Sequence, residues 1–478
     1  MPIDETSPTS GPDSSSSPSE RQQRLGLILL CSVAFIAVVN GNMINVALPF
    51  IGHHFEVSEG TYGWLVTGFS LTFGVFSAVH GRLASRVGLR RLYALGVIVL
   101  GLTSILLALT PTIEIAIGLR VLQGAGSAAM PTLATVILAR LYAQDGRGAA
   151  MGWFLGSIGV AASIGPFLGG VLVEFGGWRL VFASTSVVLL MVPLIFSVLP
   201  DFLDDQDART FDLVGAALMG FGVTALLYAF NLLERLGPGL EVASALAIGL
   251  GLMALLGWWL PRQDDPFIAP DIFADRRYLF GSILAFLANA ARFGTIVLVP
   301  IFLVEVNQVS PLVVGLVLFP GALAVALISP LSGRIGDSHG ARIPVTWGIL
   351  LVIAGSLVTA ATTGAHPIGA AAGMGLFGLG FALIQSPLLS ATTQILPERH
   401  AGTGTGVFMM IYFLGGGTGV ALSVTAVELQ ARDATSWIGL VDPGAAVYSN
   451  AVLVLAVLGI SSLFLTPALP GLNPKPSS

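Results

Sequence analysis

The chain has 478 residues, of which 54% are hydrophobic and only 10% are charged. Soluble domains carry about a quarter of their residues as charged side chains, so this composition excludes an ordinary water-soluble protein and predicts a surface that faces lipid. The formal net charge of −5 is concentrated in two short acidic loops at 201–212 and 264–275. No basic stripe is present that would bind nucleic acid. Cys31 is the only cysteine, which excludes a disulfide framework and a cysteine-based metal site.

Long apolar runs separated by short breaks predict about fourteen membrane-spanning helices, because about 20 apolar residues cross a bilayer. Backbone groups in hydrocarbon must be hydrogen-bonded internally, and the alternation of a β-barrel is absent, so helices are expected. The expected spans are 25–50, 62–83, 92–109, 113–138, 148–173, 181–199, 213–232, 242–260, 279–304, 312–332, 343–361, 368–395, 402–427 and 450–465.

These spans divide the chain into five parts. A polar N-terminal tail (1–24), expected to be disordered, precedes a six-helix bundle (25–200). Two linker helices with flanking loops (201–277) lead to a second six-helix bundle (278–466) and a short C-terminal tail (467–478). The predicted fold class is therefore an all-α polytopic membrane protein, with two six-helix bundles and two extra central helices.

The positions of lysine and arginine predict the orientation. With both termini in the cytoplasm, 16 of the 21 basic residues lie in cytoplasmic segments and three lie outside. The other two, Arg120 and Arg292, lie within the membrane. Cytoplasmic loops of membrane proteins are enriched in lysine and arginine, and the opposite orientation would reverse that bias. We therefore predict that both termini are cytoplasmic.

One loop motif occurs twice. Residues 81–90 read GRLASRVGLR and residues 333–342 read GRIGDSHGAR, an offset of 252 residues. Each copy follows the second helix of a set of six and precedes the third. Two homologous bundles explain both the helix count and the offset.

Four motifs lie in a fixed order on these helices. NVALP at 45–49 ends the first helix, the loop motif occupies 81–91, and LRVLQGAG at 119–126 lies in the fourth. The fifth helix carries Gly156, Gly165, Pro166, Gly169 and Gly170. Together they resemble the major facilitator superfamily, specifically its fourteen-span drug:H+ antiporter branch, and the layout is most similar to the Gram-positive tetracycline efflux pumps. The resemblance covers nearly the whole chain after the tail. It implies a major facilitator fold and a secondary active transporter that exports small amphipathic molecules across a bacterial inner membrane by alternating access.

The resemblance also implies roles for the motifs. In the family, the acid of the loop motif binds across the bundle interface and holds the inward side shut. Ser85 replaces that acid in the first copy and Asp337 retains it in the second, so we expect a weak first latch and an intact second one. The expected gating residues are Gly81, Arg82, Ser85, Arg86, Gly88, Arg90, Arg91, Gly333, Arg334, Asp337, Gly340 and Arg342.

The small residues of the fifth helix allow close helix packing in lipid. We expect tight contacts at glycines 152, 156, 159, 165, 169 and 170. In exporters this stretch is implied to seal one side of the central cavity. Ordinary tight packing is the alternative interpretation.

Polar side chains at bilayer depth are costly and are therefore candidate functional groups. The resemblance implies that Arg120 faces the cavity and takes part in substrate binding or proton coupling. The alternative is that Arg120 binds backbone carbonyls and fixes the packing of the helices. Arg292 lies in the first helix of the second bundle, far from either end. The other candidates for the substrate or coupling site are the amides Asn40, Asn45, Gln123, Asn289 and Gln385.

The acids that carry protons in the related antiporters are missing. Asn40, Ser85, Ala162 and Gly416 stand at their positions. The remaining candidates, Glu114, Glu305, Glu428 and His80, lie near helix ends, where we expect interfacial side chains. Proton coupling is therefore left open. Two embedded arginines without an embedded acid favour an anionic or zwitterionic substrate.

Two other functions fit the sequence. A facilitative permease or uptake transporter is favoured by the missing acids and disfavoured by the glycines of the fifth helix. A lipid-moving protein or a non-transporting sensor is the third hypothesis. No motif for ATP hydrolysis, a metal cluster or a catalytic nucleophile is present, so we expect no enzyme activity, no cofactor and no metal. The expected partners are membrane lipids, a small-molecule substrate and, where coupling survives, protons; we expect a monomer.

The topology can be tested by cysteine labelling of intact cells. We expect a cysteine at position 85 or 338 to be protected from a membrane-impermeant thiol reagent, because the bias in basic residues places both motif loops in the cytoplasm. Rapid labelling at either position before the cells are opened would contradict the orientation.

Overall fold

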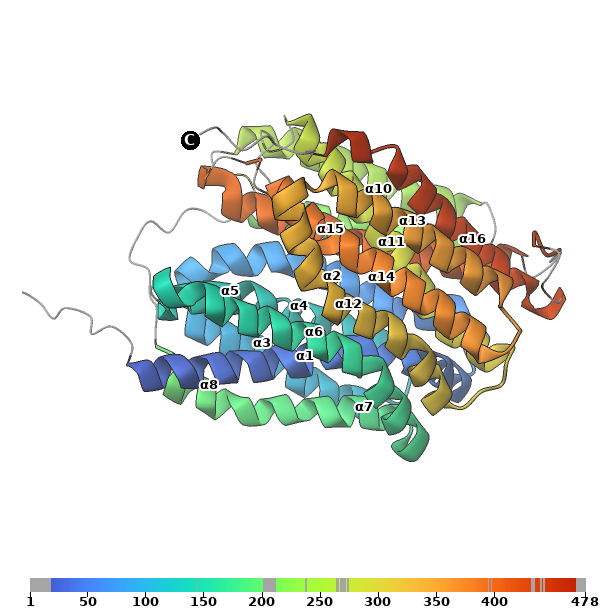
Figure 1. Cartoon of the computed structure of the whole chain (residues 1–478), viewed down its shortest axis with the longest axis horizontal. Coiled ribbons are helices and arrows are strands. Elements are labelled where there is room, and N and C mark those ends of the chain that lie inside the picture. Colours follow the sequence, from blue (N-terminus) through green and yellow to red (C-terminus); the bar gives the residue numbers. More distant parts are fainter. Residues whose placement is uncertain are drawn as a thin grey trace, which may run out of the picture.

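The structure is a computed structural model of the whole chain. It describes residues 19–469, except 143, 201–211, 237–238, 264–265, 267–271, 273–274, 394, 397, 431–434, 439–440 and 442, and the side chains of a few further residues inside helices. The described residues form a bundle of long, roughly antiparallel helices (Figure 1). The predicted tails 1–24 and 467–478 lie largely outside these residues.

The helices follow the predicted apolar runs in order. In the first half they are α1 (Glu20–Phe55), α2 (Glu59–Val87), α3 (Leu89–Ala108), α4 (Ile113–Ser127), α5 (Ala129–Leu141), α6 (Gln144–Gly176), α7 (Trp178–Thr185) and α8 (Val192–Val198), with a 3₁₀ segment at Ser186–Met191. The linker pair is α9 (Leu213–Leu236) and α10 (Leu240–Trp259), followed by a 3₁₀ turn at Leu260–Arg262. In the second half they are α11 (Arg276–Glu305), α12 (Pro311–His339), α13 (Arg342–Ala361), α14 (Pro367–Thr393), α15 (Glu398–Gln430) and α16 (Pro443–Leu463), followed by a 3₁₀ turn at Thr466–Ala468.

Among the described residues, twelve helical segments are long and apolar enough to cross a membrane. Two of them differ from the predicted continuous helices. The span 113–138 consists of α4 and α5, which meet at Ala128, and the span 181–199 consists of α7, the 3₁₀ segment and α8. Helices α2 and α9 are 29 and 24 residues long and lie in the same bundle. The protein is thus an all-helical, multi-pass membrane protein.

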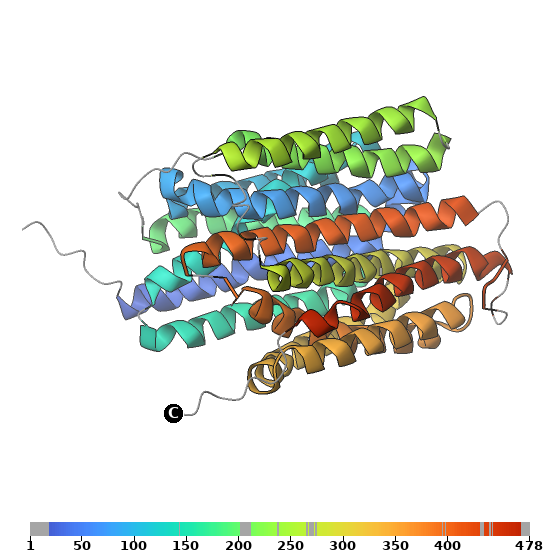
Figure 2. The same ribbon diagram turned by 90° about the horizontal axis from the view of Figure 1, so that it is seen from above.

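Both described ends of the chain lie at the same end of the bundle (Figure 2). The start of α1 and the end of α16 define what we name the chain-end face. At the opposite end, which we name the far face, α1 ends at Phe55 and α2 begins at Glu59. The helices α9 and α10 (green in Figure 2) form one edge, where Ala216, Met219 and Leu256 pack against α2 and α15.

The backbone repeats the sequence offset of 252 residues. Gly88 and Gly340, each between the second and third helices of its half, have φ of 87° and 78°, a left-handed conformation that glycine adopts without a steric penalty. Glu56 and Gln308, at the same offset, are the only described non-glycine residues with positive φ, at 54° and 53°. The two halves are therefore structural repeats.

The two halves meet through backbones that approach one another closely. A Cβ atom on Gly170 of α6 would lie 2.7 Å from the carbonyl oxygen of Pro311, and one on Gly315 of α12 would lie 2.6 Å from that of Pro166. Gly165 and Gly169 pack equally closely against Asn42 and Met43 of α1. Tight packing is therefore present at these glycines, on the part of α6 nearer the far face.

The structure differs from the prediction at Gly152 and Gly156. A Cβ atom on either glycine would contact nothing within 4 Å, and one on Gly159 would lie 3.8 Å from Ala326. These glycines lie on the same side of α6 at helical spacing, so α6 separates from α12 toward the chain-end face. Helices α6 and α12 therefore pack closely against each other only in the part nearer the far face.

The close approach of glycine can be tested at Gly419 of α15, where a Cβ atom would lie 1.9 Å from the carbonyl oxygen of Ala290 on α11. We expect Gly419→Ala to lower the free energy of unfolding by about 1–3 kcal/mol, the usual cost of overpacking, measured by thermal unfolding in detergent. Gly118→Ala is the control, because nothing lies within 4 Å of that position. Equal stability of the two variants would contradict the packing argument.

Candidate functional site: a cavity between the two bundles

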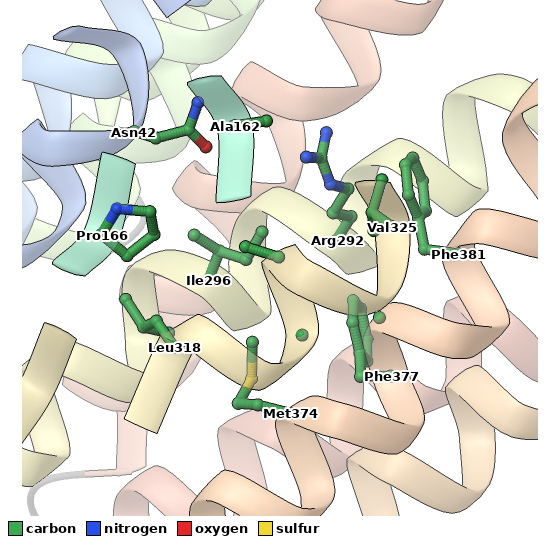
Figure 3. A pocket seen from close by; sticks show the side chains of 13 residues that line it. Asn42, Ala162, Pro166, Arg292, Ile296, Leu318, Val325, Met374, Phe377 and Phe381 are labelled. Atoms are coloured by element: carbon green, nitrogen blue, oxygen red, sulfur yellow. The ribbon is translucent and has the colours of Figure 1, made fainter. Parts of the chain in front are cut away.

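A partly open cavity lies between the two halves of the protein. The first half contributes Asn42 from α1 and Ala162 and Pro166 from α6. The second half contributes the remaining walls from α11, α12 and α14 (Figure 3). Most of these side chains are apolar; they include Ile296, Leu318, Val325, Met374, Phe377 and Phe381. Because its walls belong to both halves, the cavity changes shape when the halves move.

Among the described residues, Arg292 of α11 is the only charged one that lines this cavity. Its guanidinium carbon lies 4.4 Å from the ring centroid of Phe381 and 5.3 Å from that of Phe293. Its Nη1 donates a long hydrogen bond of 3.5 Å to the hydroxyl of Tyr412. Aromatic faces attract a cation but do not neutralise it. Arg292 therefore presents a positive charge, without a described acidic partner, to an apolar space.

Asn289 and Gln385 adjoin the cavity without lining it. Asn289 is fully buried one turn before Arg292, donates to the carbonyl of Tyr412 (2.7 Å) and has no described partner for its Oδ1 atom. Gln385 is exposed and lies one turn of α14 beyond Phe381, so it shares the side of α14 that lines the cavity. Residues at these two positions were predicted for the site, and the structure places both within one helical turn of it.

The structure places Arg120 elsewhere, inside the first bundle. The side chain is fully buried and does not line the cavity. Its Nε donates to the carbonyl of Leu65 (2.9 Å), and its Nη1 donates to Gln123 and, at 3.5 Å, to Oδ1 of Asn40. The guanidinium carbon also lies 4.2 Å from the ring centroid of Phe69. This is the packing arrangement that the sequence left as the alternative.

The network around Arg120 joins five helices. Gln123 donates to Ser104 of α3 (2.8 Å), and Asn40 of α1 donates to Thr185 of α7 (2.9 Å). Together with the Leu65 carbonyl of α2, these bonds hold the first bundle together around α4. No described carboxylate contacts Arg120, whose Nη2 atom is buried without a partner. Asn45 is likewise buried, and its Oδ1 atom has no described partner.

The gating residues are only partly described. The side chains of Gly81, Arg82, Ser85, Arg86 and Asp337 lie outside the described residues, so both proposed latches stay predictions. Arg90 binds within its own half, where it donates to the carbonyls of Phe196 (3.4 Å) and Leu199 (3.3 Å). Arg91, Arg334 and Arg342 are exposed at the chain-end face, and a Cβ on Gly333 would meet Ser386 at 2.8 Å.

The sequence did not single out the aromatic wall of the cavity. Phe377 and Phe381 are four residues apart and therefore share one side of α14. The same spacing is typical of any buried helix face, so it carried no specific signal. Asn42 lines the cavity although its amide nitrogen donates to the carbonyl of Val38 (2.8 Å) within its own helix.

Repeated helical bundles that enclose a cavity with contributions from both halves define a membrane transport protein. The chain belongs to the Major Facilitator Superfamily, whose sequence model matches residues 30–420. Among curated proteins it is 31% identical over 419 residues to multidrug resistance protein Stp of Mycobacterium tuberculosis (strain CDC 1551 / Oshkosh), covering 86% of this chain and 77% of that protein.

Two other relatives carry different names. The riboflavin transporter RibZ of Clostridioides difficile (strain 630) is 26% identical, over 80% of this chain and 84% of its own length. The puromycin resistance protein pur8 of Streptomyces alboniger is 27% identical, over 83% and 80%. A bacterial homologue of the human lysosomal transporter Spinster, solved in an inward-facing, unoccupied conformation, has the same fold, with a TM-score of 0.68, 15% identity and coverage of 94% of this chain and 98% of its own.

The position of Arg120 predicts a structural effect. We expect Arg120→Ala to lower the free energy of unfolding by about 3 kcal/mol, because the buried Leu65 carbonyl and the Gln123 amide lose their partner. Arg120→Lys should recover only part of the lost stability, since an ammonium group lacks the planar fork of the guanidinium that reaches both the Leu65 carbonyl and the Gln123 amide. Thermal unfolding in detergent measures the effect, with Arg292→Ala as the control. Unfolding of Arg120→Ala at the temperature of the unmutated protein would contradict the assignment.

Proposed function

We propose that the protein is a secondary transporter that exports small amphipathic molecules across a bacterial inner membrane by alternating access. In this proposal α2 and α9 also cross the membrane, which together with the twelve apolar segments gives fourteen spans. The chain-end face is cytoplasmic. The bias in basic residues supports this orientation. The names of two relatives, a multidrug resistance protein and a puromycin resistance protein, support export.

The observation that carries the substrate proposal is the single cation in an apolar cavity. An amphipathic molecule buries its apolar part against Phe377, Phe381 and Met374, while an anionic or zwitterionic group binds Arg292. Binding sites of this kind are lined mainly by apolar side chains, with a few polar groups that set orientation. An anionic group supplies the counter-charge that no described residue provides to Arg292.

A facilitative or uptake transporter is the second candidate. The observation that favours it is that no carboxylate is among the described residues of the cavity walls, because a membrane-embedded acid is the usual carrier of coupled protons. The name of the riboflavin transporter relative shows that the family extends beyond resistance proteins. Substrate flux in proteoliposomes with an imposed pH gradient distinguishes the two: accumulation against a concentration gradient supports the exporter, and simple equilibration supports the facilitator.

Substitution of Arg292 tests the substrate class. We expect Arg292→Ala to weaken binding of a fluorescent aromatic carboxylate by about 10- to 150-fold, the range of a hydrogen bond to a charged group. Binding of the corresponding methyl ester should change little, because the ester carries no charge. Equilibrium binding to purified protein measures both ligands.

Arg277→Ala is the matched control for this experiment, because Arg277 is an exposed arginine at the start of the same helix. It should leave both affinities unchanged. Equal weakening of the carboxylate and the ester by Arg292→Ala would show that the side chain shapes the cavity and does not bind the anionic group.

A further inference from the structure

The far face is held shut by polar contacts that cross from one half of the protein to the other. Three of them involve α1 or α2, and a fourth is the long bond of 3.4 Å that the N–H of Leu312 (α12) donates to Oε2 of Glu174 (α6). The hydroxyl of Tyr448 (α16) donates to Oε1 of Glu59 (α2) at 2.6 Å. The backbone N–H of Gly60 (α2) donates to Oε1 of Glu428 (α15) at 3.1 Å. His53 (α1) lies 2.5 Å from Oε1 of Glu305 (α11). All three contacts break when the halves separate at this face.

His53 and Glu305 occupy equivalent positions in the two repeats, because they are 252 residues apart. Their contact therefore lies where the two repeats face each other directly. This is the place at which the far face must part in an outward-open state. The sequence predicted Glu305 and Glu428 only as separate interfacial residues; the structure joins both to Glu59, which the sequence did not single out.

Glu59 lies at the centre of this group. It interacts electrostatically with Glu305 and Glu428, and one of its oxygens, Oε2, is buried without a partner. The hydroxyl of Tyr62, only 2% exposed, is also without a partner and interacts with the same three carboxylates and with Tyr448. A dry, unpaired carboxylate oxygen is costly in its charged form and acceptable in its protonated form.

The charged and titratable groups around Glu59 are thus His53, Tyr62, Glu305, Glu428 and Tyr448. No lysine or arginine among the described residues is hydrogen-bonded to the three carboxylates. Arg179, the nearest basic residue on α7, binds His54 instead (3.1 Å). Glu56 also belongs to this face, but its side chain is exposed and its carboxylate makes no described hydrogen bond. Closing the face therefore gathers negative charge, and among the described residues His53 is the basic side chain that contacts one of the three carboxylates.

We propose that Glu59, with Glu305 and Glu428, forms a proton-binding site that links closure of the far face to proton uptake. As the face closes, Glu59 takes a proton from the water at that face, and the neutral carboxyl keeps its bond from Tyr448. As the face opens, water solvates the carboxylates, and Glu59 releases its proton to the water at that face. This rests on the alternating access of the proposed function but not on its substrate.

The direction of the pH dependence follows from linkage. The closed state binds one more proton than the open state, so acid at the far face favours closure. In the pH range where the site is protonated in the closed state but not in the open state, the ratio of closed to open protein falls by up to about tenfold for each unit that the pH rises. The site thus supplies proton sensitivity to a protein in which no described residue of the cavity wall is a carboxylate.

Spin-label distances across the far face test the proposal. In a Cys31→Ser background, labels at Ser58 of the first half and Ala365 of the second report the opening of purified protein in nanodiscs between about pH 5 and pH 9. We expect the short-distance population to dominate in acid and to decline as the pH rises. Glu59→Gln should hold that population near its acid value throughout, since the amide oxygen still accepts from Tyr448 but cannot titrate.

Glu428→Gln retains the acceptor for Gly60 and should make the pH response shallower. Glu56→Gln, the matched control, removes one carboxylate from the same face and should follow the unmutated protein. Distances that do not change with pH, or a Glu59→Gln variant that titrates normally, would overturn the proposal. Loss of the response in His53→Gln alone would assign it to the histidine instead. The ligand-binding result for Arg292→Ala is measured separately, so failure of the substrate site and failure of the gate are distinguishable.

Discussion

The whole arrangement depends on backbone-to-backbone contact at glycine. Hydrophobic burial does not draw helices together in lipid, because the acyl chains are as apolar as the side chains, so close packing and hydrogen bonds must do so. Gly170 and Gly315 let α6 and α12 meet backbone to backbone between the two halves, and Gly419 does the same for α15 and α11 within one half. At Gly170 and Gly315 no side chain lies between the two backbones. That contact can part and re-form without side-chain repacking, as the proposed alternating access requires.

Arg120 and Arg292, the two arginines in the middle of helices, differ in what surrounds them. Arg120 is surrounded by acceptors from its own bundle and fills its site. Arg292 has two aromatic faces, one long bond to Tyr412 and an open cavity. At the offset of 252 residues, Arg292 is the counterpart of Asn40, which belongs to the Arg120 network. Equivalent positions in the two repeats thus carry a neutral amide that supports packing and a cation that faces the cavity.

The sequence predicted the long helices well, because apolar runs of span length have few other solutions in a membrane. The repeat was predictable from one loop motif, and Arg292 from the cost of an embedded charge. The junction between α4 and α5 at Ala128 and the 3₁₀ segment at Ser186–Met191 could not be predicted, since neither interrupts the apolar pattern of the sequence. The position of Arg120 was left as two alternatives, because a helical residue's neighbours on other helices are set by tertiary packing. Glu59 and Tyr448 meet across 389 residues, a contact that no local pattern encodes.

The distribution of charge follows from what each region must do. A cavity that accepts an anionic group is weakened by a nearby carboxylate, because like charges repel strongly at low dielectric. Acids at positions 162 and 416 would lie at or beside the cavity wall: Ala162 lines the cavity, and Gly416 adjoins Asn289. A pair of such an acid with Arg292 would remove the charge that the proposed substrate needs. The proposed proton-binding site at the far face avoids that conflict, since it would act on the opening of the cavity and leave the charge of Arg292 available.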